Sequence, residues 1–120
     1  MDTISKILVA VVAIEHLYIL YLEMFLWTTP QGMKSFGTTK EQAESSKVLA
    51  ANQGLYNGFL AVGLIWGIVN PDPVVGHQVQ IFFLVCVVVA GIYGGTTVKR
   101  SILMIQALPA LIALIAVLLA

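Results

Sequence analysis

Residues 4–27 read ISKILVAVVAIEHLYILYLEMFLW, an apolar run long enough to cross a lipid bilayer as a single helix. Three further runs of similar character follow at about 47–69, 78–98 and 101–120. We expect four membrane-spanning helices, because a helix satisfies its own backbone in lipid and the runs lack the alternation of barrel strands. The sequence therefore predicts an all-α integral membrane protein, a four-helix bundle of antiparallel up-down spans in a single domain over residues 1–120.

The composition supports a membrane location. Of the 120 residues, 59% are hydrophobic and only 10% are charged, with six basic and six acidic side chains. A soluble domain would carry about a quarter charged residues, and a chain this short could not hide so much apolar surface in one core. The absence of a basic surplus excludes nucleic-acid binding, and the single cysteine excludes an internal disulfide framework.

The basic residues predict the orientation of the helices. Only Lys6 falls on one side of the expected topology, and the other basic residues fall on the opposite side. By the positive-inside rule the richer side faces the cytoplasm, so we expect a multi-pass protein of the bacterial inner membrane with both termini on the non-cytoplasmic side. The residues on the cytoplasmic side are Lys34, Lys40, Lys47, Lys99 and Arg100.

The segment 28–46 is expected to be a cytoplasmic loop. Thr28-Thr29-Pro30 ends the first helix, because proline cannot continue the hydrogen-bond ladder. Thr38–Glu41 and Thr39–Gln42 both have the spacing of a capping box. A polar helical turn over residues 40–46 is therefore expected to lead directly into the second span.

Shorter signals mark the remaining boundaries. Asn70-Pro71-Asp72-Pro73 is a turn sequence, and we expect His77, close by, to be solvated. Gly94-Gly95-Thr96-Thr97 is expected to separate the third span from the fourth. Pro109 lies inside the last span, where its missing N–H should kink the helix.

Polar residues inside the spans are the candidate functional residues, since a carboxylate at mid-bilayer costs roughly 2.5–3.5 kcal/mol on insertion scales. In the first span, His16 and Glu23 share a helix face, and Glu15 adjoins His16. The second span carries a polar stripe of residues spaced by one helical turn. The predicted ligand-binding residues are Glu15, His16, Glu23, Asn52, Gln53, Tyr56, Asn57, Tyr93 and Gln106.

Depth along antiparallel helices predicts which of these groups meet. Glu23 lies ~6 Å and Gln53 ~9 Å inside the cytoplasmic ends of their spans, so the two are expected at one level, with Asn52 beside them. His16 is expected at the level of Asn57. The third and fourth spans each place one further polar group, Tyr93 and Gln106, ~9 Å from the same side. We therefore expect one polar pocket in the cytoplasmic half of the bundle.

Structural alternatives exist for several of these features. Asn and Gln in membrane helices often only hold helices together, at ~0.6 kcal/mol per hydrogen bond. Small residues spaced by four allow helices to approach closely, either within the chain or across a homodimer. The residues with this spacing are Gly54, Gly58, Gly63 and Gly67.

Three stretches resemble a known family. They are EHLYILYLEMF at 15–25, followed by Trp27, then ANQGLYNGFLA at 51–61 and GIYG at 91–94. They resemble motifs of a bacterial family of small membrane proteins catalogued as domain of unknown function thirteen-oh-four, over essentially the whole chain. The resemblance implies a four-helix inner-membrane protein and brings no established activity. Some members of that family are labelled alkylphosphocholine-resistance proteins.

We expect the protein to bind or transport a small amphiphilic or lipid-like molecule, with proton coupling through a glutamate as an option. The alternative is a membrane-embedded enzyme in which His16, with Glu15 or Glu23, is the general acid and base on a lipidic substrate. A third possibility is a structural bundle that assembles with itself or a partner. The expected partners are membrane lipids or a small amphiphile. No cofactor is predicted, and a metal site is disfavoured because adjacent ligands on one helix diverge by ~100°.

Overall fold

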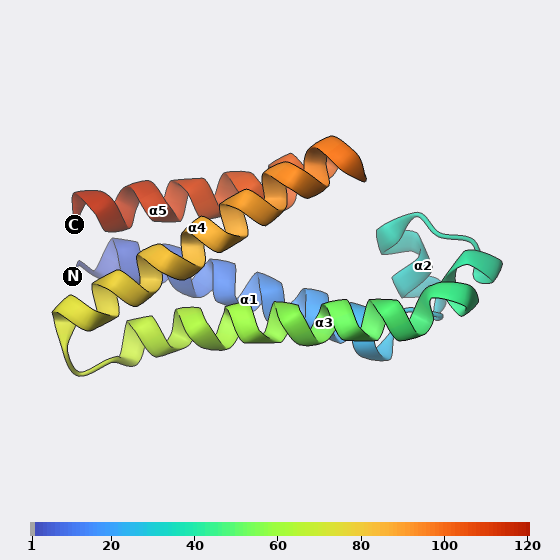
Figure 1. Cartoon of the computed structure of the whole chain (residues 1–120), viewed down its shortest axis with the longest axis horizontal. Coiled ribbons are helices and arrows are strands. Elements are labelled where there is room, and N and C mark those ends of the chain that lie inside the picture. Colours follow the sequence, from blue (N-terminus) through green and yellow to red (C-terminus); the bar gives the residue numbers. More distant parts are fainter. Residues whose placement is uncertain (1) are drawn as a thin grey trace. The chain divides into compact units, whose positions relative to one another are not determined.

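The computed structural model describes residues 2–120, and the regular structure in that range is helical. Three helices are long and apolar enough to cross a membrane, and the apolar helix over Leu103–Leu119 is shorter. The prediction of an all-α protein is therefore confirmed. The elements are α1 (Thr3–Phe25), α2 (Pro30–Phe36), α3 (Lys40–Val69), α4 (Pro73–Thr97), a π-helical turn η1 (Leu103–Ala107) and α5 (Leu108–Leu119) (Figure 1).

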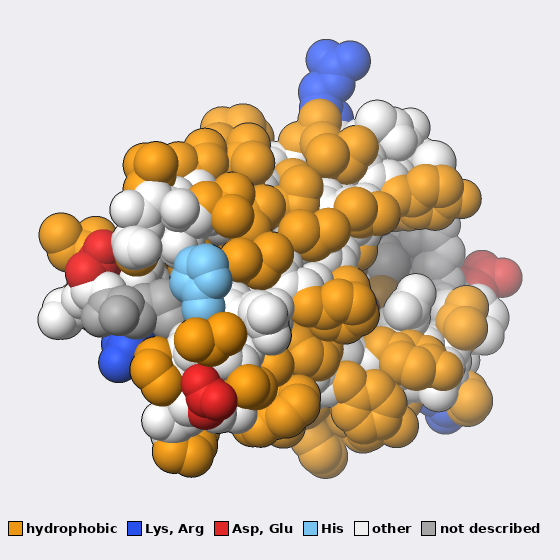
Figure 2. Space-filling model, turned by 60° about the vertical axis from the view of Figure 1, so that its left-hand side comes forward, with side chains coloured by type: hydrophobic (Ala, Val, Ile, Leu, Met, Phe, Trp, Pro, Cys, Tyr) orange, Lys and Arg blue, Asp and Glu red, His pale blue; other side chains and the backbone are white. Residues whose placement is uncertain are grey.

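Large apolar side chains cover much of the surface. Figure 2 shows a face dominated by hydrophobic side chains, with few charged ones among them. Phe25, Val62 and Leu119 are each more than half exposed. A soluble monomer rarely leaves such continuous apolar surface in water, whereas lipid tails cover it without cost. The surface therefore agrees with the long apolar helices in indicating a membrane protein.

The chain forms two compact units. One contains the residues up to Ile14 together with Leu60–Ala120, and we call it the terminal unit. The other contains Glu15–Phe59, and we call it the middle unit. Both α1 and α3 contribute to each unit, because each is divided along its length.

The terminal unit has a single apolar core to which α1, α3, α4 and α5 all contribute. Helices α4 and α5 lie side by side, and the start of α1 and the end of α5 lie at the same end as the α3–α4 turn (Figure 1). Gly91 allows α4 to approach η1 closely, since a Cβ there would lie 2.7 Å from the backbone nitrogen of Ala107. The buried core residues are Val9, Val12, Ala13, Leu64, Leu84, Val87, Ala110, Ala113 and Val117.

The end of α3 is completed by a side chain of α4. The N–H that would normally bond to the Gly67 carbonyl belongs to residue 71, and Pro71 has none. The Gln80 Nε2 donates to that carbonyl instead, at 3.0 Å. Asp72 then begins α4 by accepting from the backbone of Val74 at 2.9 Å. The predicted turn is thus present, and the hydrogen bond from the buried Gln80 stabilises its α3 side.

The last apolar segment is not one regular α-helix. Pro109 has no N–H to donate to the carbonyl four residues before it, so the α-helical ladder cannot run through this point unchanged. Directly before it, Leu108 N–H donates to the Leu103 carbonyl, five residues back, which is the π-helical pattern. The expected irregularity around Pro109 therefore takes the form of η1.

Two boundary predictions for α4 are wrong. Gly94–Thr97 is helical, because Val98 and Lys99 both donate their N–H groups to the Gly94 carbonyl and close the helix beyond the glycines. His77 lies inside α4 and is partly buried, with its Nε2 at 3.0 Å from the Val117 carbonyl. That contact joins the start of α4 to the end of α5.

In the middle unit, the expectation of loop structure from residue 28 to Thr39 is also wrong. Pro30–Phe36 forms α2, because Thr29 accepts a hydrogen bond from the Gly32 backbone and Pro30 occupies the first turn, where its missing N–H costs nothing. Gly37 ends the helix with φ 67°, a left-handed conformation that glycine adopts without strain. Thr-Pro therefore starts a helix here in addition to ending the previous one.

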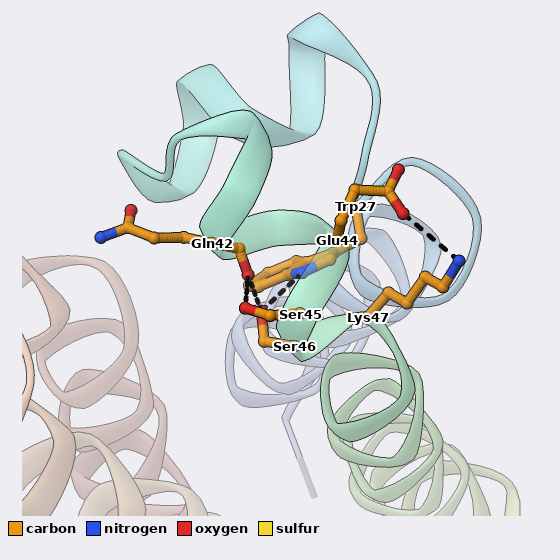
Figure 3. A network of polar contacts seen from close by, with 6 residues as sticks. All are labelled: Trp27, Gln42, Glu44, Ser45, Ser46 and Lys47. Carbon is orange, nitrogen blue, oxygen red and sulfur yellow. Dashed lines mark hydrogen bonds and ion pairs between the residues drawn. The ribbon is translucent and has the colours of Figure 1, made fainter.

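The start of α3 follows the predicted capping box. Thr39 N–H donates to Gln42 Oε1 at 2.9 Å, and Gln42 N–H donates back to Thr39 Oγ1 at 3.2 Å. One turn on, Ser46 Oγ donates to the Gln42 carbonyl and accepts from the Trp27 indole at 3.1 Å (Figure 3). The Trp27 ring also packs on Phe36, with centroids 4.8 Å apart. The connection between α1 and α3 is therefore a folded structure.

Candidate functional site between α1 and α3

Two glycines bring α1 and α3 together in the middle unit. A Cβ on Gly54 would lie 2.7 Å from Met24 Cγ and 3.1 Å from Glu23 Cβ. A Cβ on Gly58 would lie 2.6 Å from Leu20 Cδ1. A side chain at Gly54 would also press on the α1 backbone, since the Leu20 carbonyl oxygen would lie 3.2 Å from its Cβ, so this glycine lets the two helices approach closely. These small residues thus serve contacts within the chain.

The central contact of the site joins Glu23 of α1 to Asn57 of α3. Asn57 Nδ2 donates to Glu23 Oε1 at 2.6 Å, across a sequence separation of 34 residues. Both side chains are half-buried. The ion pairs within residues 2–120 join Glu15 to His16 and Glu44 to Lys47, so Glu23 has no cationic partner there. The site is thus an acid with an amide donor and no counter-charge.

The helix register differs from the predicted one by about one turn. Glu23 was expected beside Asn52 and Gln53, and it bonds to Asn57 instead. The expected level assumes that Trp27 and Lys47 mark the same depth. Helix α3 begins at Lys40 and runs well past the end of α1 at Phe25, so Glu23 lies opposite a residue further along α3 than that assumption places it.

Glu15 and His16 form a second polar pair on α1. His16 is 0% exposed, and Glu15 Oε1 lies 3.9 Å from its Nδ1. That distance is too long for a hydrogen bond, so the two attract each other only when the imidazole is protonated. Glu15 Oε1 is buried without a hydrogen-bond partner among the described residues.

The remaining predicted residues lie outside the Glu23–Asn57 contact. Asn52, Gln53 and Tyr56 lie on the exposed side of α3. Tyr93, which is exposed, and Gln106 belong to the terminal unit. Their part in a common pocket stays a prediction.

Two buried polar residues, Ser5 and Gln80, are not among the predicted ones. Gln80 is fully buried, and its Oε1 has no hydrogen-bond partner among the described residues. A glutamine within an apolar helix gives no pattern of its own. The available signal was Pro71, which leaves the Gly67 carbonyl without its usual donor and so requires one from elsewhere.

The other two candidate dimer glycines also pack inside the chain. A Cβ on Gly63 would collide with the ring of Phe83, and one on Gly67 would lie 2.6 Å from Gln80 Cγ. Both contacts lie within the terminal unit. A homodimer through these glycines stays a prediction.

The chemistry available at the site is ionic and hydrogen-bonding. Within residues 2–120 there is no group of three or more His, Cys, Asp or Glu side chains placed to hold a metal ion. The Glu23 carboxyl can accept a proton or a cation, and Asn57 can orient a polar group. Neither is a nucleophile of the serine or cysteine type.

Comparison with known proteins gives two matches. The model of a family described as "Protein of unknown function (DUF1304)" matches residues 10–118. The uncharacterized protein YpaA of Lactococcus lactis subsp. lactis (strain IL1403) is 34% identical over 119 residues, which cover 96% of this chain and 97% of that protein. No solved structure matches the chain.

Proposed function

The chain belongs to the family described as Protein of unknown function (DUF1304), and from that premise we propose that it binds a small amphiphile with a cationic head. We place it in the bacterial inner membrane with four spans, the fourth being the shorter helix over Leu103–Leu119, and with both termini outside. The three long apolar helices and the distribution of Lys and Arg support this arrangement.

The observation that carries the proposal is the state of Glu23. Its half-buried carboxyl accepts one hydrogen bond from Asn57 and has no ion-pair partner among residues 2–120. A carboxylate inside a membrane helix is costly unless a cation or a proton compensates it. A cationic head group bound there would supply the missing charge, while Asn57 holds the carboxyl in position.

The surroundings suit the rest of an amphiphile. Tyr21 with Phe25 on α1, and Tyr56 with Phe59 on α3, are exposed aromatic pairs with centroids 6.1 Å and 5.8 Å apart. Aromatic faces attract quaternary ammonium groups, and aliphatic helix surfaces accept an alkyl chain. The alkylphosphocholine-resistance label carried by some family members agrees with such a ligand.

A transport function would also involve the binding of a proton to the Glu23 carboxyl. A carboxyl that holds either a proton or a cation exchanges one for the other, so cation movement in one direction would be coupled to proton movement in the opposite direction. Glu23 is the candidate for this exchange because it lacks a fixed counter-charge.

The test is binding of a fluorescent alkyltrimethylammonium, whose head is a cation, to the purified protein in nanodiscs. Glu23→Gln is expected to weaken binding at least about tenfold, since a charge-assisted contact is worth ~1.5–3 kcal/mol. Glu44→Gln, which removes an exposed acid of α3 that pairs with Lys47, is the matched control and should bind like the parent. Equal affinity of the parent and Glu23→Gln would refute the proposal.

Catalysis is the second candidate, and the structure gives it less support. His16 lies near Glu15, which suits a general acid–base pair, but its side chain has no exposed surface through which a substrate could be reached. If turnover of a lipid extract is found, His16→Ala should abolish it. Undiminished turnover in His16→Ala would remove His16 from the mechanism.

A further inference from the structure

The turn between α4 and η1 lies at the end of the terminal unit opposite to the α3–α4 turn (Figure 1). A surface hollow is present there, lined by residues 95–100 and Leu103. Gly95 packs directly on Leu103 and lets α4 and η1 approach closely at this turn. Lys99 and Arg100 stand side by side on its wall.

These two cations are unpaired. The ion pairs among the described residues include neither Lys99 nor Arg100, whereas Lys47 of the middle unit is neutralised by Glu44 at 3.3 Å. Nor are the two side chains required to hydrogen-bond the carbonyl groups at the end of α4. The Gly94 carbonyl accepts two backbone N–H groups, and the Tyr93 carbonyl accepts the hydroxyls of Thr96 and Thr97. Two residues that are adjacent in the sequence and line the hollow therefore carry positive charges with no acidic partner among the described residues.

Apolar surface adjoins the charged hollow. Val98, on its wall, is 79% exposed, and Met104, next to Leu103, is 65% exposed. One turn back along α4, Tyr93 is 70% exposed. A soluble anion such as phosphate makes no favourable contact with exposed apolar side chains. A molecule with an anionic head and a hydrocarbon tail matches both surfaces at once.

We propose that this hollow binds the phosphate of an anionic phospholipid, with Lys99 and Arg100 holding the head group and Val98 and Met104 contacting the acyl chains. The proposal rests on the membrane location given under Proposed function, and it is independent of the Glu23 site. The expected orientation places the turn at the cytoplasmic leaflet, whose surface attracts juxtamembrane basic residues.

The test uses native mass spectrometry of the full chain in dodecyl maltoside with equimolar phosphatidylglycerol and phosphatidylcholine. The parent is expected to retain phosphatidylglycerol preferentially. The double variant Lys99→Gln/Arg100→Gln should lose about 30-fold in that preference, the product of two basic contacts. Lys34→Gln/Lys40→Gln removes the same charge elsewhere and should keep the preference.

Three outcomes would overturn the proposal. One is an unchanged preference in Lys99→Gln/Arg100→Gln, and another is an equal loss in Lys34→Gln/Lys40→Gln, which would indicate net charge alone. The third is displacement of the lipid by millimolar inorganic phosphate, which would identify a soluble anion as the ligand. None of these readouts involves Glu23 or a cationic amphiphile, so failure here leaves the first proposal standing.

Discussion

The terminal unit and the middle unit are held together by different means. The terminal unit has one buried apolar core, to which four helices contribute side chains. In the middle unit the buried apolar side chains are only Leu22, Ala43 and Ala50, and the distant helices are joined by polar contacts such as Glu23–Asn57 and Trp27–Ser46. In lipid, close packing provides more stability than a single hydrogen bond. The polar residues of α1 and α3 thus gather in the unit with the smaller apolar core, where they join helices that are distant in the sequence.

The largest loss of unfolding free energy is expected at Gly91, where α4 packs directly against the backbone of Ala107. In Gly91→Ala the added methyl would lie 2.7 Å from the Ala107 nitrogen and 2.8 Å from its Cα, neither of which can move alone. We expect a loss of about 3 kcal/mol in unfolding free energy, measured by SDS titration of the protein in mixed micelles. Gly94→Ala is the control, because its methyl would meet only the Ile102 side chain, at 3.3 Å. Equal losses in the two variants would show that α4 packing does not set the stability of the terminal unit.

A polar contact inside the apolar unit sharpens the comparison. Gln80→Leu leaves the Gly67 carbonyl without a donor, since residue 71 is a proline, and about 2 kcal/mol should be lost. The same substitution at Gln78, exposed on the same helix, should change the unfolding free energy by less than about 0.5 kcal/mol. If Gln80→Leu were as stable as the parent, the cap would be dispensable and its burial would need another reason.

The Glu23–Asn57 bond should contribute little to stability despite its short distance. A double-mutant cycle of Glu23→Leu and Asn57→Leu is expected to give a coupling energy of about 0.6 kcal/mol, the average for such contacts in membrane proteins. The same SDS titration measures it. A coupling above about 2 kcal/mol would mean that the polar seam holds the middle unit together, and would favour the structural interpretation over ligand binding.

Local signals in the sequence predicted much of the helical structure. The apolar runs coincide with α1, α3, α4 and the segment over Leu103–Leu119, and Thr39–Gln42 forms its capping box. Helix α2 was not predicted, because Thr29-Pro30 predicts the end of one helix. The same pair also begins a helix, with Thr29 accepting from the backbone N–H of Gly32 and Pro30 in the first turn. Such signals act within a few residues, which is why the chain displays them directly.

Contacts between distant segments were harder to predict. Glu23 and Asn57 are both among the polar residues that the sequence places inside the spans, but their pairing depends on how far α3 extends past α1 and on how Gly54 sets the helix approach. The roles of His77 and Gln80 were missed because each bonds to a backbone carbonyl of another helix. A carbonyl is present in every residue, so the sequence does not name the pair, although Pro71 marks the Gly67 carbonyl as one without its usual donor.

The smallest effect is expected at the start of α1, where the Asp2 side chain is exposed. Ser5 N–H donates to Asp2 Oδ1 at 2.7 Å, and this bond lowers the pKa of the Asp2 carboxyl below its usual value. A lowered pKa in the folded state means that the contribution to stability is present above the unfolded pKa and is lost as the pH falls through the folded one. Titration by NMR should therefore show the Asp2 carboxyl and the Ser5 amide moving together, with a midpoint below that of an ordinary aspartate. In Asp2→Asn the low-pH movement of the Ser5 amide should vanish. If it persists, another group controls that amide, and helix α1 begins without help from the carboxylate.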